Sequence, residues 1–233
     1  MDAAAERARE GDVAYFTVGA GSGSFRDLCT KKDSDGRTLL HSAAAGGSIE
    51  LVQAIAAQLP SADVVNDKDD EGWTPLHSAV SAGHEPVVKE LLKLGADVNS
   101  LTAGHRTPLH YAASKGWLAL ITLLLHHGAD VTVQDNTGST ALHRAASAGK
   151  VEAARLLIET GRAQVDARDK QGSTPLMVAV SCDFGSLALY LVGKGADVEA
   201  VNKADENPLG VATPELREAM RAACAPAGTD AME

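Results

Sequence analysis

The sequence repeats a short motif at a nearly constant interval, and this constrains the fold more than any other feature. Six segments align: Thr38-Leu-Leu-His41, Thr74-Pro-Leu-His77, Thr107-Pro-Leu-His110, Thr140-Ala-Leu-His143, Thr174-Pro-Leu-Met177 and Asn207-Pro-Leu-Gly210. Their first residues are 36, 33, 33, 34 and 33 positions apart. A second motif, Gly-Ala-Asp-Val, keeps the same interval at Gly95, Gly128 and Gly195, with the altered Gly161-Arg-Ala-Gln-Val before the last of these. Such a period is typical of a repeat array.

Each unit of the repeat predicts two short helices without a core of their own. The threonine of the motif suits a helix N-cap, and the proline after it suits the first helical position, where its missing N–H is harmless. A second helix follows, with apolar residues such as Val87, Leu91 and Leu120 at helical spacing. We expect glycines to end these helices: Gly83, Gly116 and Gly149 after the first, and Gly95, Gly128 and Gly161 after the second. Such helix pairs must gain their stability by stacking on their neighbours.

Composition excludes several classes of partner. Lys and Arg number 21 against 31 Asp and Glu, which gives a formal charge of −10. Sequence-independent DNA binding depends on Lys and Arg meeting phosphates, and a polybasic membrane patch is missing too. Aromatic residues make up 3% of the chain, too few for the stacking platforms of single-strand binders. We therefore expect neither nucleic acid nor membrane among the partners.

The same features predict where the protein resides. The first twelve residues, MDAAAERAREGD, carry charges where a signal peptide needs an apolar core, and no apolar run approaches about 18 residues. Cys29, Cys182 and Cys224 are an odd number at wide spacing, which favours a reducing compartment over a disulfide framework. We expect a soluble cytoplasmic protein with access to the nucleus.

The residues that could carry chemistry favour structural roles. Four histidines, His41, His77, His110 and His143, hold the same place in successive units. Stacked helices lie about 8–10 Å apart, whereas a zinc ligand sits about 2 Å from its metal, so these side chains cannot easily share an ion. We expect each imidazole to hydrogen-bond its own threonine and a neighbouring backbone group. No metal or cofactor is predicted.

Sequence motifs of enzymes are equally unsupported. The glycine- and serine-rich segment 19–24 is not followed by the Gly-Lys-Ser/Thr of a phosphate-binding loop. Neither a Gly-x-Ser-x-Gly nor a His-Glu-x-x-His motif occurs. We expect a protein that is not an enzyme.

These units resemble ankyrin repeats over most of the chain. The resemblance implies an all-α ankyrin-repeat solenoid of about seven helix-turn-helix repeats with β-hairpin tips. The repeats are expected at residues 1–32, 33–68, 69–101, 102–134, 135–168, 169–201 and 202–224, as a single array over 1–224. The first repeat matches poorly and the last lacks the histidine, which is typical of capping repeats. We expect residues 225–233 to be a disordered tail, and the protein to be a monomer.

Function is therefore expected on a surface. In ankyrin arrays, the tips and the exposed positions of the first helices line one concave face. The protein-binding residues that these positions predict are Asp35, Arg37, Asp70, Glu71, Trp73, Arg106 and Lys115. An exposed tryptophan among charges of both signs has the composition of a binding hot spot, and the mixed signs favour a partner with complementary patches. For Trp73 the alternative is packing on the adjacent tip.

Three segments are similar to the gankyrin family of proteasome assembly chaperones: VNDKDDEGWTPLH at 65–77, TPLHYAASK at 107–115 and ALHRAA at 141–146. As in that family, Asp183 replaces the glycine that ends a helix in the sixth repeat. The resemblance implies that the concave face holds the C-terminal domain of one ATPase subunit of the proteasome regulatory particle. By position, it implies partner contacts for Arg37, Asp70, Trp73 and Lys115, with Asp35 and Arg106 as additions.

Two other classes of function stay open at this stage. A general ankyrin-repeat adaptor for another signalling or regulatory protein, such as a kinase, channel or transcription factor, satisfies the repeat pattern equally well. An enzyme that acts through a cysteine or a histidine is the third class.

Overall fold

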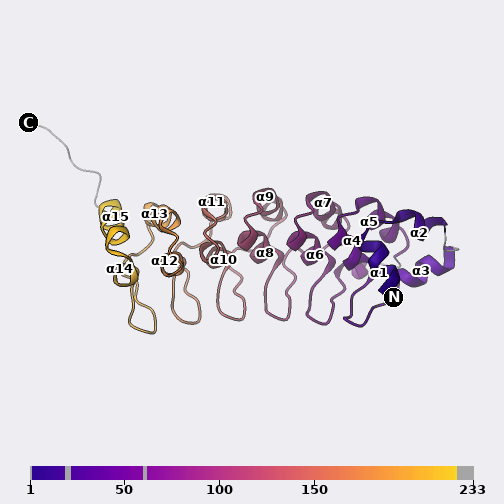
Figure 1. Cartoon of the computed structure of the whole chain (residues 1–233), viewed down its shortest axis with the longest axis horizontal. Coiled ribbons are helices and arrows are strands. Elements are labelled where there is room, and N and C mark those ends of the chain that lie inside the picture. Colours follow the sequence, from indigo (N-terminus) through magenta and orange to yellow (C-terminus); the bar gives the residue numbers. More distant parts are fainter. Residues whose placement is uncertain (1, 19–21, 60–61, 225–233) are drawn as a thin grey trace, which may run out of the picture. The chain divides into compact units, whose positions relative to one another are not determined.

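The computed structural model describes residues 2–18, 22–59 and 62–224 and consists of short helices joined by loops (Figure 1). The chain divides by its contacts into two compact units. The first unit comprises residues 1–112 and 117–130, and the second comprises residues 113–116 and 131–233.

The first unit is built from helix pairs in which each helix packs on its counterpart in the next pair. Its elements are α1 (Asp2–Arg9), α2 (Val13–Val18), α3 (Ser22–Thr30), α4 (Leu39–Gly46), α5 (Ile49–Ala56), the 3-10 helix η1 (Ala62–Asn66), α6 (Pro75–Ala82), α7 (Glu85–Lys93), α8 (Pro108–Lys115) and α9 (Leu118–His126). The last three residues of α8 belong to the second unit. Helix α4 contacts α1 on one side and α6 on the other, while α5 contacts α2 and α7. The poorly matching first repeat therefore supplies a helix pair, α1 and α2, that packs like the others.

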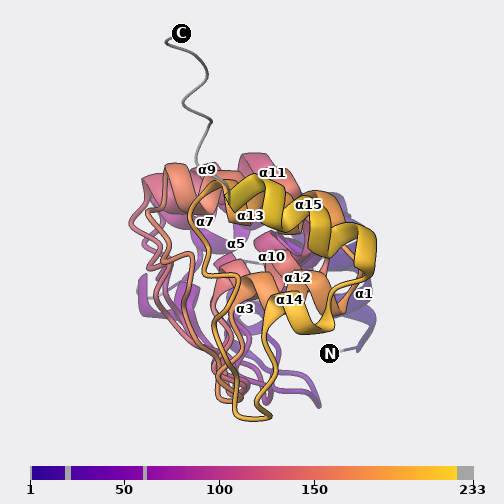
Figure 2. The ribbon, with the colours of Figure 1, turned by 90° about the vertical axis from the view of Figure 1, so that its left-hand side faces the viewer.

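The second unit repeats the same packing. Its helices are α10 (Ala141–Ser147), α11 (Val151–Glu159), α12 (Pro175–Ser181), α13 (Gly185–Gly193), α14 (Pro208–Val211) and α15 (Pro214–Cys224). The first helices α10, α12 and α14 contact one another in order, and so do the second helices α11, α13 and α15. Figure 2 shows α12 and α14 side by side below α13 and α15.

Small and branched apolar side chains fill both units, as the composition predicts. Leu39, Leu76 and Leu91 are fully buried in the first unit, and Leu142 and Leu187 are buried in the second. The alanine pairs of the first helices are buried as well, at 43–44, 112–113 and 145–146. Because alanine has a single methyl group, neighbouring first helices can approach closely.

The predicted helix signals are confirmed where the motif is intact. Thr74 and Thr174 cap α6 and α12, and a proline follows each at the start of the helix. Glycines 83, 116 and 149 have positive φ angles after the first helices, and so do Gly95 and Gly128 after the second. Asp183 takes the same left-handed conformation, with φ of 61°, in place of a glycine.

One predicted helix stop holds, but with a different backbone conformation. Gly161 does not adopt a positive φ; the next residue, Arg162, does, with φ of 58°. Helix α11 ends at Glu159, and this repeat is one residue longer than its neighbours between successive Thr motifs. The additional residue moves the left-handed position from the glycine to the arginine.

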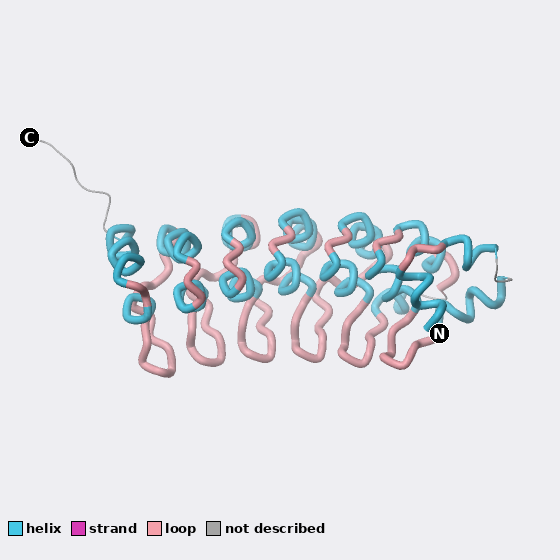
Figure 3. Tube along the Cα trace, in the orientation of Figure 1, coloured by secondary structure: helices cyan, strands magenta, loops and turns pink. Residues whose placement is uncertain are grey.

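The tips are turns rather than β-hairpins with strands. No strand occurs in the described residues; the loops in Figure 3 carry one isolated bridge, between Lys32 and Thr38. Each tip is instead closed by backbone hydrogen bonds across five residues, as from Asp69 N–H to the Trp73 carbonyl at 2.9 Å. The tips thus keep a hairpin shape without a sheet.

The boundaries predicted for the array meet these observations in part. Helix pairs occur from α1 to α15. Because the contacts divide the chain into two compact units, the single array over 1–224 stays a prediction. The tail predicted at 225–233 lies outside the described residues, as do residues 19–21 of the glycine- and serine-rich segment.

Candidate protein-binding site

An aspartate at the first position organises most of the tips. The Asp69 carboxylate oxygen Oδ1 accepts hydrogen bonds from the backbone N–H groups of Glu71, at 3.0 Å, and Trp73, at 2.7 Å. Asp33 makes the same two bonds in the preceding tip, and Asp135 and Asp169 do so in the second unit. Aspartate favours this local bonding, which turns the chain sharply. The turn then presents the residues that follow it.

Arg37 connects two successive tips. Its Nε donates to the second carboxylate oxygen of Asp69, at 3.1 Å, and the Asp69 side chain is 1% exposed. A buried carboxylate requires such a partner, since losing it leaves an uncompensated charge. Arg37 is therefore a structural strut for the tip that carries Trp73, in addition to its predicted part in binding. Its Nη groups make no hydrogen bond within the described residues.

Trp73 packs on the next repeat and still reaches the surface. Its ring centroid lies 4.8 Å from that of Tyr111 on α8 and 6.0 Å from that of His77 on α6. The side chain is half-buried. Aromatic pairs at this separation favour each other and hold the rings in place. The indole is thus held in place and stays partly exposed, which suits a contact with another protein.

The other predicted residues of the first unit lie on the same row of tips. Asp35, Asp70 and Glu71 have exposed side chains. Their backbones link the tips in sequence: Asp70 N–H donates to the Asp35 carbonyl at 3.0 Å, and Ala103 N–H donates to the Glu71 carbonyl at 2.9 Å. The tips of the first unit thus form one connected edge that carries Trp73 and the exposed carboxylates of Asp35, Asp70 and Glu71.

Arg106 and Lys115 differ from these residues. Arg106 ends the tip of the fourth repeat and is half-buried, and its carbonyl oxygen accepts a hydrogen bond from His77 Nε2 at 3.1 Å. Lys115 is exposed at the end of α8 and belongs to the second unit. The structure groups six of the seven predicted residues in the first unit, and the part of Lys115 in the same site stays a prediction.

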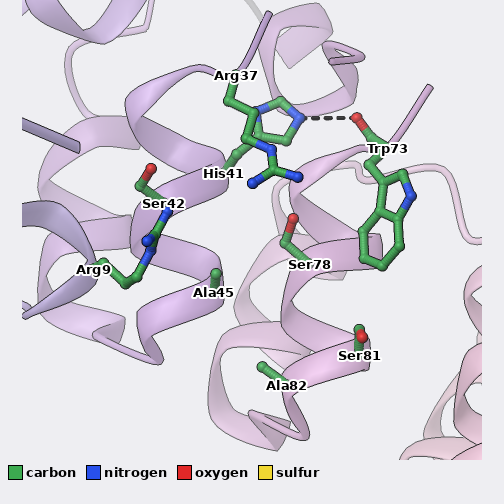
Figure 4. A pocket seen from close by; sticks show the side chains of 9 residues that line it. All are labelled: Arg9, Arg37, His41, Ser42, Ala45, Trp73, Ser78, Ser81 and Ala82. Atoms are coloured by element: carbon green, nitrogen blue, oxygen red, sulfur yellow. Dashed lines mark hydrogen bonds between the residues drawn. The ribbon is translucent and has the colours of Figure 1, made fainter. Parts of the chain in front are cut away.

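The repeated histidines join each first helix to the next tip. His41 Nδ1 accepts from the Thr38 backbone N–H at 3.1 Å, while its Nε2 lies 2.9 Å from the Trp73 carbonyl oxygen (Figure 4). His77 and His143 repeat this arrangement with Thr74 and Thr140 on one side and the next tip on the other. Nδ1 accepts and Nε2 donates, so the neutral imidazole fits the site. The predicted structural role is confirmed for His41, His77 and His143, and His110 shows the bond to its own Thr107.

Burial keeps His41, His77 and His143 uncharged. It lowers the pKa of His41 and His143, and it lowers the pKa of His77 to about 4, against the raising effect of the hydrogen bond to the Arg106 carbonyl. At neutral pH, the imidazoles therefore connect the repeats through hydrogen bonds and do not act as acids or bases.

A pocket of about 230 Å³ opens beside this edge (Figure 4). It lies in the first unit, among α1, α4 and α6 and the tips before them. Its lining residues are Arg9, Arg37, His41, Ser42, Ala45, Trp73, Ser78, Ser81 and Ala82. No acidic side chain lines it, although the chain as a whole is strongly acidic.

The described residues contain no cluster of metal-binding side chains, and one of their cysteines, Cys29, is buried. Within them, no three His, Cys, Asp or Glu side chains gather as a metal site. Burial raises the pKa of the Cys29 thiol to about 11, so this group is protonated at neutral pH. In the same part of the chain, none of the helices has both the length and the apolar composition needed to span a bilayer.

The repeat family follows from a comparison with known families. The profile of ankyrin repeats (3 copies) matches residues 1–102, 64–135 and 109–202, which together span most of the chain. The protein belongs to the ankyrin-repeat family. Membership indicates a protein-binding scaffold and favours a binding protein over an enzyme.

Curated relatives of this ankyrin-repeat protein cover a shorter stretch. The chain is 37% identical over 64 residues to protein phosphatase 1 regulatory subunit 27 of Homo sapiens. It is 35% identical over 64 residues to the protein of the same name in Mus musculus. Each match covers 28% of this chain, and it spans about two fifths (41%) of the relative.

Sequence reasoning missed several residues of this ankyrin-repeat surface. Asp33 and Asp69 shape the tips, and their recurrence as Asp-x-x-Gly with Asp135 and Asp169 was a signal that could have found them. Arg9 and Ser42 line the pocket without any sequence signal. Arg9 comes from the first repeat, whose match to the consensus is poor.

Proposed function

We propose that this ankyrin-repeat protein is a scaffold that acts as an assembly chaperone of the proteasome regulatory particle. In this proposal, the row of tips around Trp73 grips the C-terminal domain of one proteasomal ATPase subunit. The sequence similarity of residues 65–77 and 107–115 to the gankyrin family supports the choice of partner. The observation that carries the binding role is the half-exposed Trp73, held against Tyr111 at 4.8 Å within an edge of charged side chains.

The mode of binding follows from the residues of this edge. A rigid aromatic side chain loses little conformational freedom on binding and can bury a large area. The surrounding carboxylates of Asp35, Asp70 and Glu71 attract basic residues of the partner and set its orientation. Such charge pairs at the rim weaken as salt is added.

The proposal is tested by mixing the purified protein with the isolated ATPase C-terminal domain and measuring affinity by calorimetry. We expect a one-to-one complex that weakens between low and physiological salt. Trp73→Ala should weaken it by about 30-fold, the effect of removing a hot-spot residue of about 2 kcal/mol. Trp117→Ala is the matched control, because Trp117 is 42% exposed at the start of α9, against Gly83, and does not line the pocket beside the tips.

The contribution of charged residues to binding is tested separately from that of Trp73. Lys115→Glu should slow association and lower affinity, whereas Lys93→Glu, an exposed change on α7, should leave both near the parent values. Arg37 is unsuitable for reversal, because its loss would strand the buried Asp69 carboxylate. Absence of a complex at low ionic strength rejects the ATPase domain as partner.

A second candidate is an adaptor for another regulatory protein. The similarity of 64 residues to a regulatory subunit of protein phosphatase 1 favours that phosphatase as the alternative partner. The same calorimetric titration with protein phosphatase 1 separates the two, since each candidate predicts binding to one protein alone. Affinity purification that recovers the phosphatase and no regulatory-particle subunit favours the adaptor.

A further inference from the structure

Two arginines, Arg9 and Arg37, line the pocket among α1, α4 and α6. Arg9 lines it from α1 and is exposed, with no hydrogen bond or ion pair to any described residue. Its neighbour Glu10 is instead within 3.5 Å of Arg7. On the other wall, the Nη groups of Arg37 are unpaired, while its Nε is held by Asp69. Two guanidinium groups thus face one pocket that no carboxylate lines.

A buried hydroxyl group in the same pocket lacks a partner. Ser42 is 2% exposed, and its Oγ makes no hydrogen bond in the described structure. Buried polar groups are normally satisfied, so an orphaned one calls for an explanation. Ser42 lies on α4 beside Arg9 in Figure 4, and rotation about its single χ1 bond redirects the hydroxyl without breaking any hydrogen bond.

We propose that this pocket is a subsite for one acidic side chain, an aspartate or glutamate, of the protein partner. This rests on the proposed binding function and adds to it a defined position that the first repeat helps to form. The Arg9 guanidinium meets the carboxylate, the Ser42 hydroxyl donates to it, and the Trp73 ring covers the methylene groups of the side chain. Guanidinium–carboxylate pairs are the strong, directional bonds that suit such a contact.

The dimensions of the pocket agree with this occupant. Its volume of about 230 Å³ is several times what one water molecule needs. Ser78 and Ser81 on α6 complete a polar lining on the side opposite Arg9. The pocket therefore has room for one acidic side chain.

The two tryptophans of the chain allow a direct test by NMR. Acetyl-Gly-Glu-Gly-amide is titrated into the protein, and the indole N–H signals of Trp73 and Trp117 are followed. We expect a saturable shift of Trp73, which lines the pocket, and none of Trp117, with a Kd of about 1–10 mM. Acetyl-Gly-Gln-Gly-amide, which has the same shape without the charge, should bind about tenfold more weakly.

Substitutions at Arg9 and Ser42 test where the carboxylate of the peptide binds. Arg9→Gln should weaken the peptide with glutamate about fivefold or more, whereas Arg7→Gln on the same helix, outside the pocket, should leave its affinity within twofold. Ser42→Ala should also weaken binding while leaving the melting temperature unchanged or higher, since it removes an unpartnered hydroxyl. A purely structural role for Ser42 predicts a lower melting temperature instead.

The outcomes separate this inference from the proposed function. Equal binding of the two peptides, no shift of Trp73, or wild-type binding by Arg9→Gln overturns the subsite, even if the ATPase domain binds. Binding of the peptide with glutamate alone, together with no complex of the ATPase domain, upholds the subsite and rejects that partner.

Discussion

The buried motif histidines His41, His77 and His143 are placed where their charge state matters for stability. In His77, Nδ1 accepts from the Thr74 N–H and Nε2 lies against the Arg106 carbonyl oxygen. A proton added at Nδ1 would face the N–H group and remove that acceptor. The change of stability with pH therefore reports on the hydrogen bonds that these buried imidazoles make between repeats.

We predict that stability falls as pH falls from about 6.5 toward 4. The pKa of His77 is about 4 in the folded protein against 6.5 in the unfolded chain, so the unfolded state binds the additional proton between these values. The contribution is complete above pH 6.5 and lost on acidification, by about 2 kcal/mol for His77 between pH 6.5 and 5. Urea unfolding at a series of pH values measures it.

His77→Gln separates titration from hydrogen bonding. Glutamine at this position can still close a capping box with Thr74, but it does not titrate. The variant should be less stable than wild type at pH 7.5, while its stability should change less between pH 6.5 and 5. An unchanged slope in the variant contradicts the role given to His77.

At the scale of elements, a glycine decides how closely α1 approaches α4. A Cβ atom added at Gly46 would lie 2.1 Å from the backbone carbonyl oxygen of Arg9. That contact is with backbone, so the helices themselves must separate. Helix α1 carries Arg9 to the pocket, and Gly46 therefore supports the site as well as the packing.

We predict that Gly46→Ala destabilises the protein by about 1–3 kcal/mol, as overpacking does. Gly193→Ala is the matched control, because it also lies at the last position of a helix and a Cβ there meets nothing within 4 Å. Helix propensity alone should make the control more stable, by up to about 1 kcal/mol. Urea unfolding of both variants measures the difference, and equal effects would contradict the close contact.

The tip of the fourth repeat, residues 102–106, contains one residue in a strained backbone conformation, and a substitution can relieve this strain. Four other tips place Gly36, Gly72, Gly138 and Gly172 at the left-handed position, whereas this tip places His105 there, with φ of 57°. The side chain is exposed, so little packing is at stake. His105→Gly should raise stability by about 0.5–1 kcal/mol, because only glycine adopts this conformation without cost. His126→Gly, at the exposed end of α9, should lower the melting temperature instead.

At the scale of the whole molecule, the repeat period predicts the helices but not their irregularities. Thr74, Pro75 and Gly83 each act through local backbone chemistry, so the sequence alone was sufficient to place α6. Arg162 takes the position expected of Gly161 because one additional residue shifts the turn. The bond from Arg37 to Asp69 joins residues 32 positions apart, and Arg9 reaches the pocket from a repeat that barely matches the period. Contacts of that kind depend on side-chain directions that no repeat consensus records.

The last prediction concerns how far a local change spreads through the chain. Helices contact mainly the other helix of their pair and their counterparts in adjacent pairs, as α13 contacts α12, α11 and α15. Stability in such arrays is a sum of local terms between neighbours. Leu187→Ala, at a fully buried position on α13, should cost about 2–5 kcal/mol. Hydrogen exchange should therefore accelerate in α11, α12, α13 and α15, while the amides of α4 and α6 stay near wild-type rates. Uniform acceleration over the described helices would mean that the chain unfolds as one cooperative body. The affinity for a partner held at the tips of the first unit would then depend on the stability of every repeat.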